Sequence, residues 1–169
     1  MNPMREIRLA KVTINMGAGE SGPKLEKCRK IIEIVTGKKS VTTITKKRST
    51  FGVAKHRPIG VKVTVRGEEA KSLLKKLLHA VDNKLKESCF DENGNFSFGI
   101  QEYIHIPGVR YDPDVGILGM DVAVTLERPG FRIKKRRIRH SVIGKSHRIK
   151  KEEAIDWARK NLNVEIVQA

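Results

Sequence analysis

The residues with the most recognisable chemical spacing are three glycines near the N-terminus, Gly17, Gly19 and Gly22. They match the G-x-G-x-x-G pattern of dinucleotide-binding loops, in which the backbone approaches a pyrophosphate at the start of a helix. Such a loop also requires an acidic residue about 20 positions further on, at the end of the next strand. Lys46 and Lys47 stand there instead. The missing acid weakens the match to this pattern. We therefore keep a nucleotide- or dinucleotide-dependent enzyme that uses the Gly17 to Gly22 loop only as an alternative hypothesis.

Other side chains capable of catalysis or metal binding are scattered. Cys28 and Cys89 are far apart in the sequence, and no histidine has another at helical i, i+4 spacing. Asp112 and Asp114 flank Pro113, a pattern typical of a turn. We therefore expect no catalytic residues, no cofactor and no metal.

Positive charge is concentrated in two segments of this 169-residue chain, whose net charge is +16. The first basic segment, Lys38–Arg66, contains nine Lys or Arg residues and no acid, and the second, Arg128–Lys151, contains eleven and no acid. The rest of the chain carries a net charge of −4. Acid-free basic segments favour binding to a polyphosphate through counterion release. Anionic lipid would also attract them, but neither has the pattern of an amphipathic helix with an aromatic face.

Composition sets the scale of the fold. A hydrophobic fraction of 38% over 169 residues is sufficient for the core of a single domain. The sequence contains no apolar run of about 18 residues, and its first ten residues are polar and mixed in charge. We therefore expect a soluble intracellular protein with neither a membrane span nor a secretory signal.

The elements that must position the charged residues follow from hydrophobic periodicity. Ile59, Val61, Val63 and Val65 alternate with polar or small residues, which predicts a half-buried strand with one basic face. The same reasoning predicts strands over 7–16, 41–45, 59–66, 96–106 and 120–127, and helices over 23–37, 67–85 and 152–162.

This order of elements predicts an α+β fold: a two-layer sandwich with an antiparallel-rich mixed sheet. Helices pack on one face of the sheet, and the other face is left open. We expect residues 1–127 to form an RNA-binding core. Residues 128–169 should form a basic C-terminal extension whose terminal helix packs on the same domain.

The 13-residue connection Lys46–Pro58 is long enough to be either functional or disordered. It joins the strands predicted over 41–45 and 59–66, which should pair as a hairpin. Phe51 is its one large apolar residue, and both packing on the domain and stacking on a base are open to it.

Several stretches resemble the ribosomal protein L5 family of the large ribosomal subunit. The most extensive are Val12–Glu20 (VTINMGAGE), Ile34–Lys39 (IVTGKK), Pro58–Gly67 (PIGVKVTVRG) and Asn95–Ile100 (NFSFGI). The resemblance runs in order from position 2 to 127. The later stretches Arg128–Phe131 (RPGF) and Gly144–Ile149 (GKSHRI) are similar to the archaeal and eukaryotic branch of the family.

The resemblance implies that the other face of the sheet is open for RNA. It implies a structural protein that binds 5S ribosomal RNA (rRNA) with this face and helps attach it to the large subunit. It also implies that Asn15, Lys38 and Thr64 contact the 5S RNA, and that Lys46–Pro58 reaches large-subunit rRNA and the peptidyl-site (P-site) tRNA. The loop Pro107–Gly116 would face a protein of the small-subunit head. Further implied properties are a neighbouring 5S-associated ribosomal protein as partner, no homo-oligomer, and a location on the cytoplasmic ribosome.

Charge and resemblance together predict a set of RNA-binding residues. It comprises Asn15, Lys38, Lys46, Lys47, Arg48, Phe51, Lys55, His56, Arg57, Lys62, Thr64, Arg66, Arg132, Lys134, Lys135, Arg136 and Arg137. Whether the second basic segment recognises RNA or only clamps its phosphates is left open by the sequence.

Overall fold

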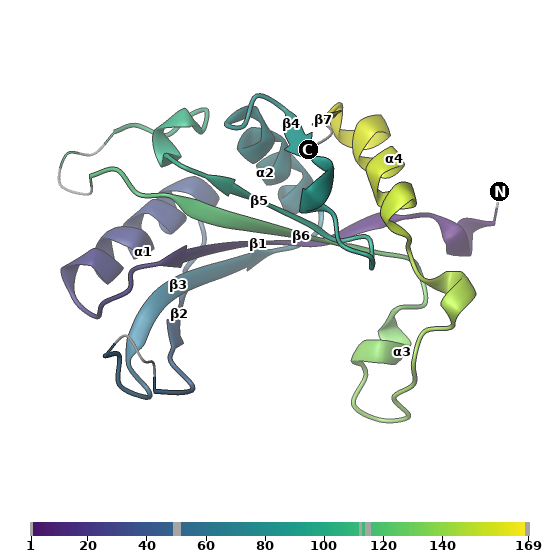
Figure 1. Ribbon diagram of the computed structural model, residues 1–169, viewed down its shortest axis with the longest axis horizontal. Coiled ribbons are helices and arrows are strands. Elements are labelled where there is room, and N and C mark those ends of the chain that lie inside the picture. The colour runs from purple at the N-terminus through teal and green to yellow at the C-terminus, as the bar shows by residue number, and fades with distance from the viewer. Residues whose placement is uncertain (1, 49–51, 112, 114–115, 168–169) are drawn as a thin grey trace.

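A five-stranded sheet forms the centre of the structure, a computed structural model that describes residues 2–48, 52–111, 113 and 116–167 (Figure 1). The strands follow the order β2-β3-β1-β6-β5, and every neighbouring pair is antiparallel. Their bounds are β1 (Arg8–Gly17), β2 (Val41–Ile44), β3 (Pro58–Val65), β5 (Phe96–Ile100) and β6 (Met120–Glu127).

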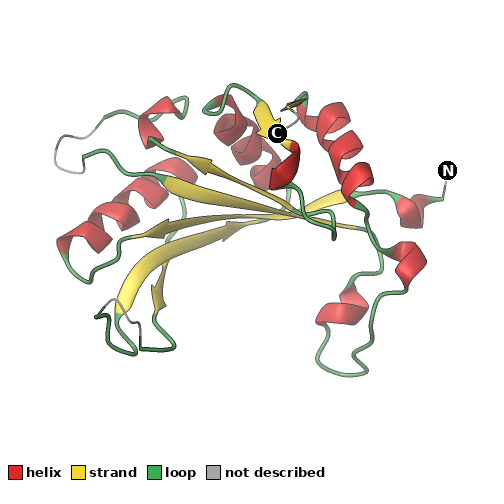
Figure 2. Ribbon diagram, viewed as in Figure 1, coloured by secondary structure: helices red, strands yellow, loops and turns green. Residues whose placement is uncertain are grey.

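Three longer helices accompany this sheet: α1 (Pro23–Thr36), α2 (Glu68–His79) and α4 (Lys151–Leu162). A four-residue helix, α3 (Arg132–Lys135), lies in the second basic segment. In Figure 2, α2 and α4 lie above the sheet, whereas the β2–β3 connection and the segment around α3 descend below it at opposite ends.

One face of the sheet is buried beneath the helices. Val12, Ile14 and Met16 of β1 are almost fully buried, and they alternate with the more accessible Thr13 and Asn15. The buried face shares a core with the apolar stripes of the helices, including Ile31, Ile32, Leu74, Leu77 and Leu78. The other face is open. The predicted α+β fold, with helices on one face, is confirmed.

The ends of the helices follow from local chemistry. Helix α1 begins at Pro23, whose missing N–H would have no partner at that position, and Gly37 caps the helix in the left-handed conformation at φ 65°. The sequence predicts that α2 reaches residue 85, but the helix ends at His79. Asp82 and Asn83 then adopt left-handed conformations, and both are residue types that tolerate this region.

The residues after that turn form a small second sheet, which the sequence did not predict. Strand β4 (Lys84–Lys86) pairs in parallel with β7 (Glu165–Val167). This is the only parallel pairing in the described part of the chain, so the main sheet is antiparallel and not mixed. The strand predicted over 96–106 is also too long, because β5 ends at Ile100 and a 3-10 turn follows at Tyr103–His105.

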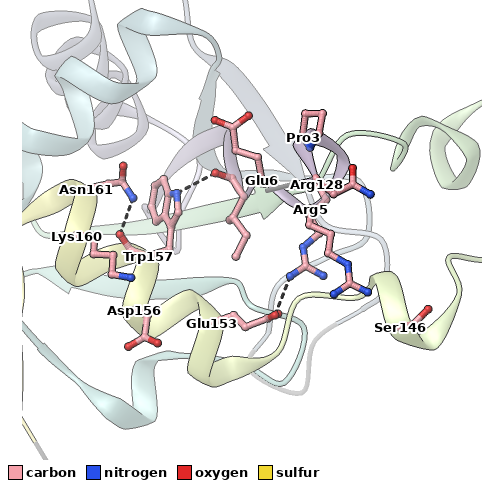
Figure 3. A pocket seen from close by; sticks show the side chains of 12 residues that line it. Pro3, Arg5, Glu6, Arg128, Ser146, Glu153, Asp156, Trp157, Lys160 and Asn161 are labelled. Carbon is pink, nitrogen blue, oxygen red and sulfur yellow. Dashed lines mark hydrogen bonds and ion pairs between the residues drawn. The ribbon is translucent and has the colours of Figure 1, made fainter.

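The C-terminal residues share the core of the rest of the chain. Ile149, Ala154, Ala158 and Val164 are buried in the same cluster as the sheet and the first two long helices. The indole N–H of Trp157 donates to the backbone oxygen of Ile7 at 3.0 Å and joins α4 to the chain just before β1 (Figure 3). The terminal helix is therefore fixed against the central sheet.

Candidate nucleic-acid interface

The open face of the sheet is made of rows of short polar side chains, because residues opposite one another in neighbouring strands share a face. Asn15 of β1 lies opposite Lys62 of β3 on one side and Asp121 of β6 on the other. In the next row, Thr13 lies opposite Thr64, with their hydroxyl oxygens 3.4 Å apart. These groups can bond to ribose hydroxyls and phosphate oxygens at close range.

The side chains at the centre of this face are small. Thr13 lies opposite Ala123 of β6, and Ala123 lies opposite Ser97 of β5. In β3, which lies between β2 and β1, a Cβ at Gly60 would lie 2.8 Å from Oγ1 of Thr43 and 3.0 Å from the backbone oxygen of Met16. A larger residue at position 60 would thus force the strands or the Thr43 side chain to shift.

Charges on the open face are nearly balanced. Arg8, Lys11 and Lys62 supply the cations, and Asp121 and Glu127 supply the anions. A β-bulge between Leu9 and Lys11 shifts the alternation and places Arg8 opposite Glu127. Lys11 and Thr13 were not among the predicted RNA-binding residues, although their alternation with Val12 and Ile14 is the signal that could have revealed them.

At one end of this face, the loop of the first basic segment has a closed base. The Thr45 hydroxyl donates to the backbone oxygen of Ala54 at 2.8 Å and accepts from the N–H of Arg57 at 3.0 Å. Backbone hydrogen bonds also join Thr45 to His56 and Arg57. The exposed cations Lys46, Lys47, Arg48, Lys55, Arg57, Lys62 and Arg66 have no ion pair within the described residues. Phe51 lies outside the described residues.

At the other end, the second basic segment begins with an arginine that faces inward. Arg128 is only 6% exposed and donates to the backbone oxygens of His147 and Arg148. Its guanidinium also pairs with a Glu153 carboxylate oxygen at 2.8 Å (Figure 3). Arg128 therefore connects β6, the end of the basic segment and α4, and does not project toward solvent.

The partner of Arg128 is itself held at the start of α4. The Glu153 carboxylate accepts the backbone N–H of Lys150 at 2.9 Å, which satisfies one free donor at the helix start. Burial alone would raise the pKa of Glu153, but the hydrogen bonds from Lys150 and Arg128 and the charges of both residues outweigh burial and lower it. The Glu153 carboxylate therefore stays ionised at pH values below the ordinary pKa of a glutamate side chain.

The tip of the second basic segment is held by its own bonds. Nε of Arg136 donates to the backbone oxygen of Arg139 at 2.7 Å, and the Lys135 ammonium pairs with Glu127 of β6. Arg132, Lys134 and Arg137 are exposed and have no ion pair among the described residues. Part of the positive charge of this segment is thus engaged within the protein.

The three residues predicted to contact 5S RNA do not all lie together. Asn15 and Thr64 lie on the open face in adjacent rows. Lys38 follows α1 instead, and its ammonium pairs with Glu69 in the first turn of α2. Since α2 packs on the opposite face of the sheet, Lys38 is separated from Asn15 and Thr64. In the sequence, Lys38 is followed by other basic residues, and no local pattern indicates that Glu69 lies beside it in the fold.

The glycine motif lacks the geometry of a dinucleotide site. The backbone N–H groups of Ala18 and Gly19 donate to the backbone oxygen of Ile59 at 2.8 and 3.2 Å, so they are directed at β3 and are not free for a phosphate. Both neighbours of β1 are antiparallel to it, whereas a dinucleotide fingerprint lies in a parallel βαβ unit. The loop therefore connects a strand to a helix without forming a phosphate cradle.

A metal centre and a membrane-spanning helix each place requirements on the described residues. Among the residues that the structure describes, no three His, Cys, Asp or Glu side chains are grouped so as to hold a metal ion. Over the same described ranges, no helix has both the length and the apolar character needed to cross a bilayer.

Comparison with known proteins identifies the family. Residues 2–53 match the family model described as Ribosomal protein L5, and residues 58–157 match the model for the C-terminus of the same ribosomal family. The chain is 53% identical to "Large ribosomal subunit protein uL5" of Sulfurisphaera tokodaii, over 99% of this chain and 96% of the relative. Proteins of the same name from Nanoarchaeum equitans and Methanosphaera stadtmanae are 52% and 47% identical, over 98% of this chain and 99% of each relative.

All three relatives come from archaea and are named as proteins of the large ribosomal subunit, not as enzymes. The match to two adjoining family models covers both sides of the loop in the first basic segment. The resemblance found in the sequence is confirmed, and the hypothesis of a nucleotide-dependent enzyme is not supported. The chain belongs to the ribosomal protein L5 family.

Proposed function

We propose that this protein is a structural component of the large ribosomal subunit that binds 5S rRNA with the open face of its sheet. Its two basic segments hold RNA phosphates at either end of that face. In this role the protein attaches 5S rRNA to large-subunit rRNA in the central protuberance and works on cytoplasmic ribosomes. The names of the archaeal relatives support the placement in the large subunit.

The observation that carries this proposal is the position of the two basic segments relative to the sheet. The β2–β3 connection and the α3 region descend at opposite ends of the face that the helices leave open (Figure 1). Exposed cations in both segments can neutralise phosphates, which supplies affinity without selecting a sequence. The small hydroxyl and amide groups between them can bond to riboses, which distinguish RNA from DNA.

The same arrangement suggests the other partners. The described parts of this loop, residues 46–48 and 52–57, descend beyond the sheet, and their cations have no ion pair among the described residues. The loop is therefore the part suited to reach large-subunit rRNA and the P-site tRNA. The connection 107–116 would bridge to a small-subunit head protein; part of it, including Asp112 and Asp114, lies outside the described residues. A neighbouring 5S-associated ribosomal protein completes the proposed set of partners, and the protein acts as a single copy.

The decisive experiment captures RNA from a lysate of the source cells with the purified protein and sequences it. We expect 5S rRNA to be enriched relative to its abundance. A matched control replaces Lys75 and Lys76 of α2 with alanine, since these exposed lysines lie on the helical side and should leave the enrichment unchanged. Recovery of RNAs in proportion to their abundance would overturn the proposal.

A further inference from the structure

A cavity of about 510 Å³ lies where the second basic segment meets the end of β6 and the turn at residues 91–95. Its volume is within the range of about 300 to 1,000 Å³ that is usual for sites binding small molecules. Asn93 of the turn, Thr125 of β6, and Phe131, Lys134, His140 and Arg148 of the basic segment contribute to its lining. The cavity is therefore a concave site within a basic surface.

The walls of this cavity are fixed by packing. Gly94, at φ 79°, lies so close to Ile149 that a Cβ at position 94 would clash with the Ile149 side chain. Phe131 packs against the core, and its ring meets the ring of His147 edge-on with centroids 5.7 Å apart. The turn and the basic segment thus hold a preformed space between them.

Several polar groups that line the cavity are available to a ligand. Within the described residues, the Asn93 side-chain amide, the Thr125 hydroxyl and the His140 ring have no hydrogen-bond partner. Strand β5 begins at Phe96 opposite Val124, so no strand in the described part of the chain continues alongside Thr125–Glu127 on that side. Alternate residues of this stretch therefore present backbone donors and acceptors toward an open edge.

The charges at the cavity favour an anionic ligand. Lys134 and Arg148 lie at its wall, and Lys135 is paired with Glu127, the one acid among the lining residues. Phe131 and the neighbouring aliphatic groups supply apolar surface, which a phosphate alone would not use. A ligand with a planar ring, hydrogen-bonding edges and a phosphate would satisfy all of these groups.

We propose that this cavity binds a single nucleotide that is unstacked from the bound RNA, with its base against Phe131 and His140 and its phosphate beside Lys134 and Arg148. The amide of Asn93 and the hydroxyl of Thr125 meet the edge of the base. This inference rests on the proposed function, since it assigns one nucleotide site to the RNA-binding surface. It adds recognition of an exposed base to phosphate binding by the second basic segment.

The test titrates the full-length ¹⁵N-labelled protein with each of the four 5′-nucleoside monophosphates. Inorganic phosphate and ribose 5-phosphate serve as controls for charge and sugar. We expect at least one monophosphate to shift the backbone signals of Asn93, Thr125 and His140, and neither control to do so. Equal shifts with inorganic phosphate would show a phosphate site only, and no shift with any of the four would remove the site; either result overturns the proposal.

Two variants sharpen the result. His140→Ala should weaken binding of the monophosphate about 5- to 150-fold, the range expected for loss of a stacking partner. His105→Ala removes an exposed imidazole outside the cavity and should leave the affinity unchanged. Equal affinities for the wild type and His140→Ala would contradict the assigned base contact. The titration does not require 5S RNA, so its failure is distinct from a failure of the RNA capture.

Discussion

The two basic segments differ in how they use their charge. In the first, Lys38 pairs with Glu69, but the loop that follows is closed by hydroxyl and backbone bonds of Thr45. The exposed lysines and arginines of this loop form no ion pairs among the described residues. In the second, Arg128 is buried against Glu153, and Lys135 pairs with Glu127. The second segment contains more Lys and Arg residues, but several of these bind protein groups.

This difference shows that a charge count alone does not measure an RNA-binding surface. Removing an exposed loop cation should alter RNA affinity and leave the fold intact. Removing Arg128 should alter the fold first, because two backbone oxygens and a carboxylate lose their donor.

The largest effect on RNA binding should come from replacing Lys46, Lys47, Arg48 and Lys55 together with alanine. Affinity falls with salt, and each phosphate contact adds about 0.7 to 0.9 to the steepness of log affinity against log salt concentration. The salt dependence of the variant should therefore be less steep by about 3. The same change at Lys134, Lys135, Arg136 and Arg137 should lower the slope by less, because Lys135 is paired with Glu127. Filter-binding titrations at several salt concentrations measure both slopes. A larger fall for the second set would reverse the comparison.

Arg128→Met should have the largest effect on stability. The variant leaves Glu153 and two backbone oxygens without their charged donor, which should cost about 2 to 3 kcal/mol of unfolding free energy. Urea unfolding followed by circular dichroism measures this loss. Lys55→Met is the matched control and should stay within about 0.5 kcal/mol of the wild type. An unchanged stability together with weaker RNA binding would place Arg128 on the RNA-facing surface.

The sheet between the two segments should control specificity. Asn15→Ala and Thr64→Ala should each weaken 5S binding by about 1 to 3 kcal/mol if the lost contact is charge-assisted or leaves its partner unpaired. Both should keep the folded circular-dichroism spectrum, since neither side chain is part of the core. Parallel titrations with 5S RNA and an unrelated stem-loop measure the preference. Ser72→Ala on α2 is the control, and equal losses for both RNAs would limit these residues to general affinity.

The smallest effect concerns pH. Because the pKa of Glu153 is lowered in the folded protein, its contribution to stability is complete above the ordinary glutamate value of about 4.3. That contribution is lost as the pH falls through the lowered pKa. The stability advantage of the wild type over Glu153→Gln should therefore be constant from neutral pH to about 5 and shrink below about 4. Urea unfolding of both proteins across this range supplies the measurement, and an advantage that grows in acid would contradict the assigned pairing.

Local patterns in the sequence predicted most of the central fold. The alternation of Val61, Val63 and Val65 with Lys62 and Thr64 identified β3 and the residues of its open face. The stripe in α1 and its glycine cap were equally local signals. These features could be predicted because burial of one face imposes its period directly on the residues.

The features that were missed depend on contacts between distant residues. Strands β4 and β7 are three residues long and stabilise each other although they are far apart in the chain, so neither has a period of its own. Lys38 and Arg128 resemble their basic neighbours in sequence, and only their contacts with Glu69 and Glu153 separate them from exposed cations. The sequence alone therefore could not show which basic residues of each segment are free to face RNA, because the positions of Glu69 and Glu153 depend on the fold.

The central position of β1 has a consequence for the order of folding. Its partner β6 lies more than a hundred residues later in the chain, and β7 closes the small sheet only at the end. During synthesis, the hairpin of β2 and β3 can form early and pair with β1, which leaves the other edge of β1 unprotected until β6 emerges. Such long-range pairing slows folding and favours association between unfinished chains. Early nascent chains of this protein should therefore be the species that most requires a chaperone.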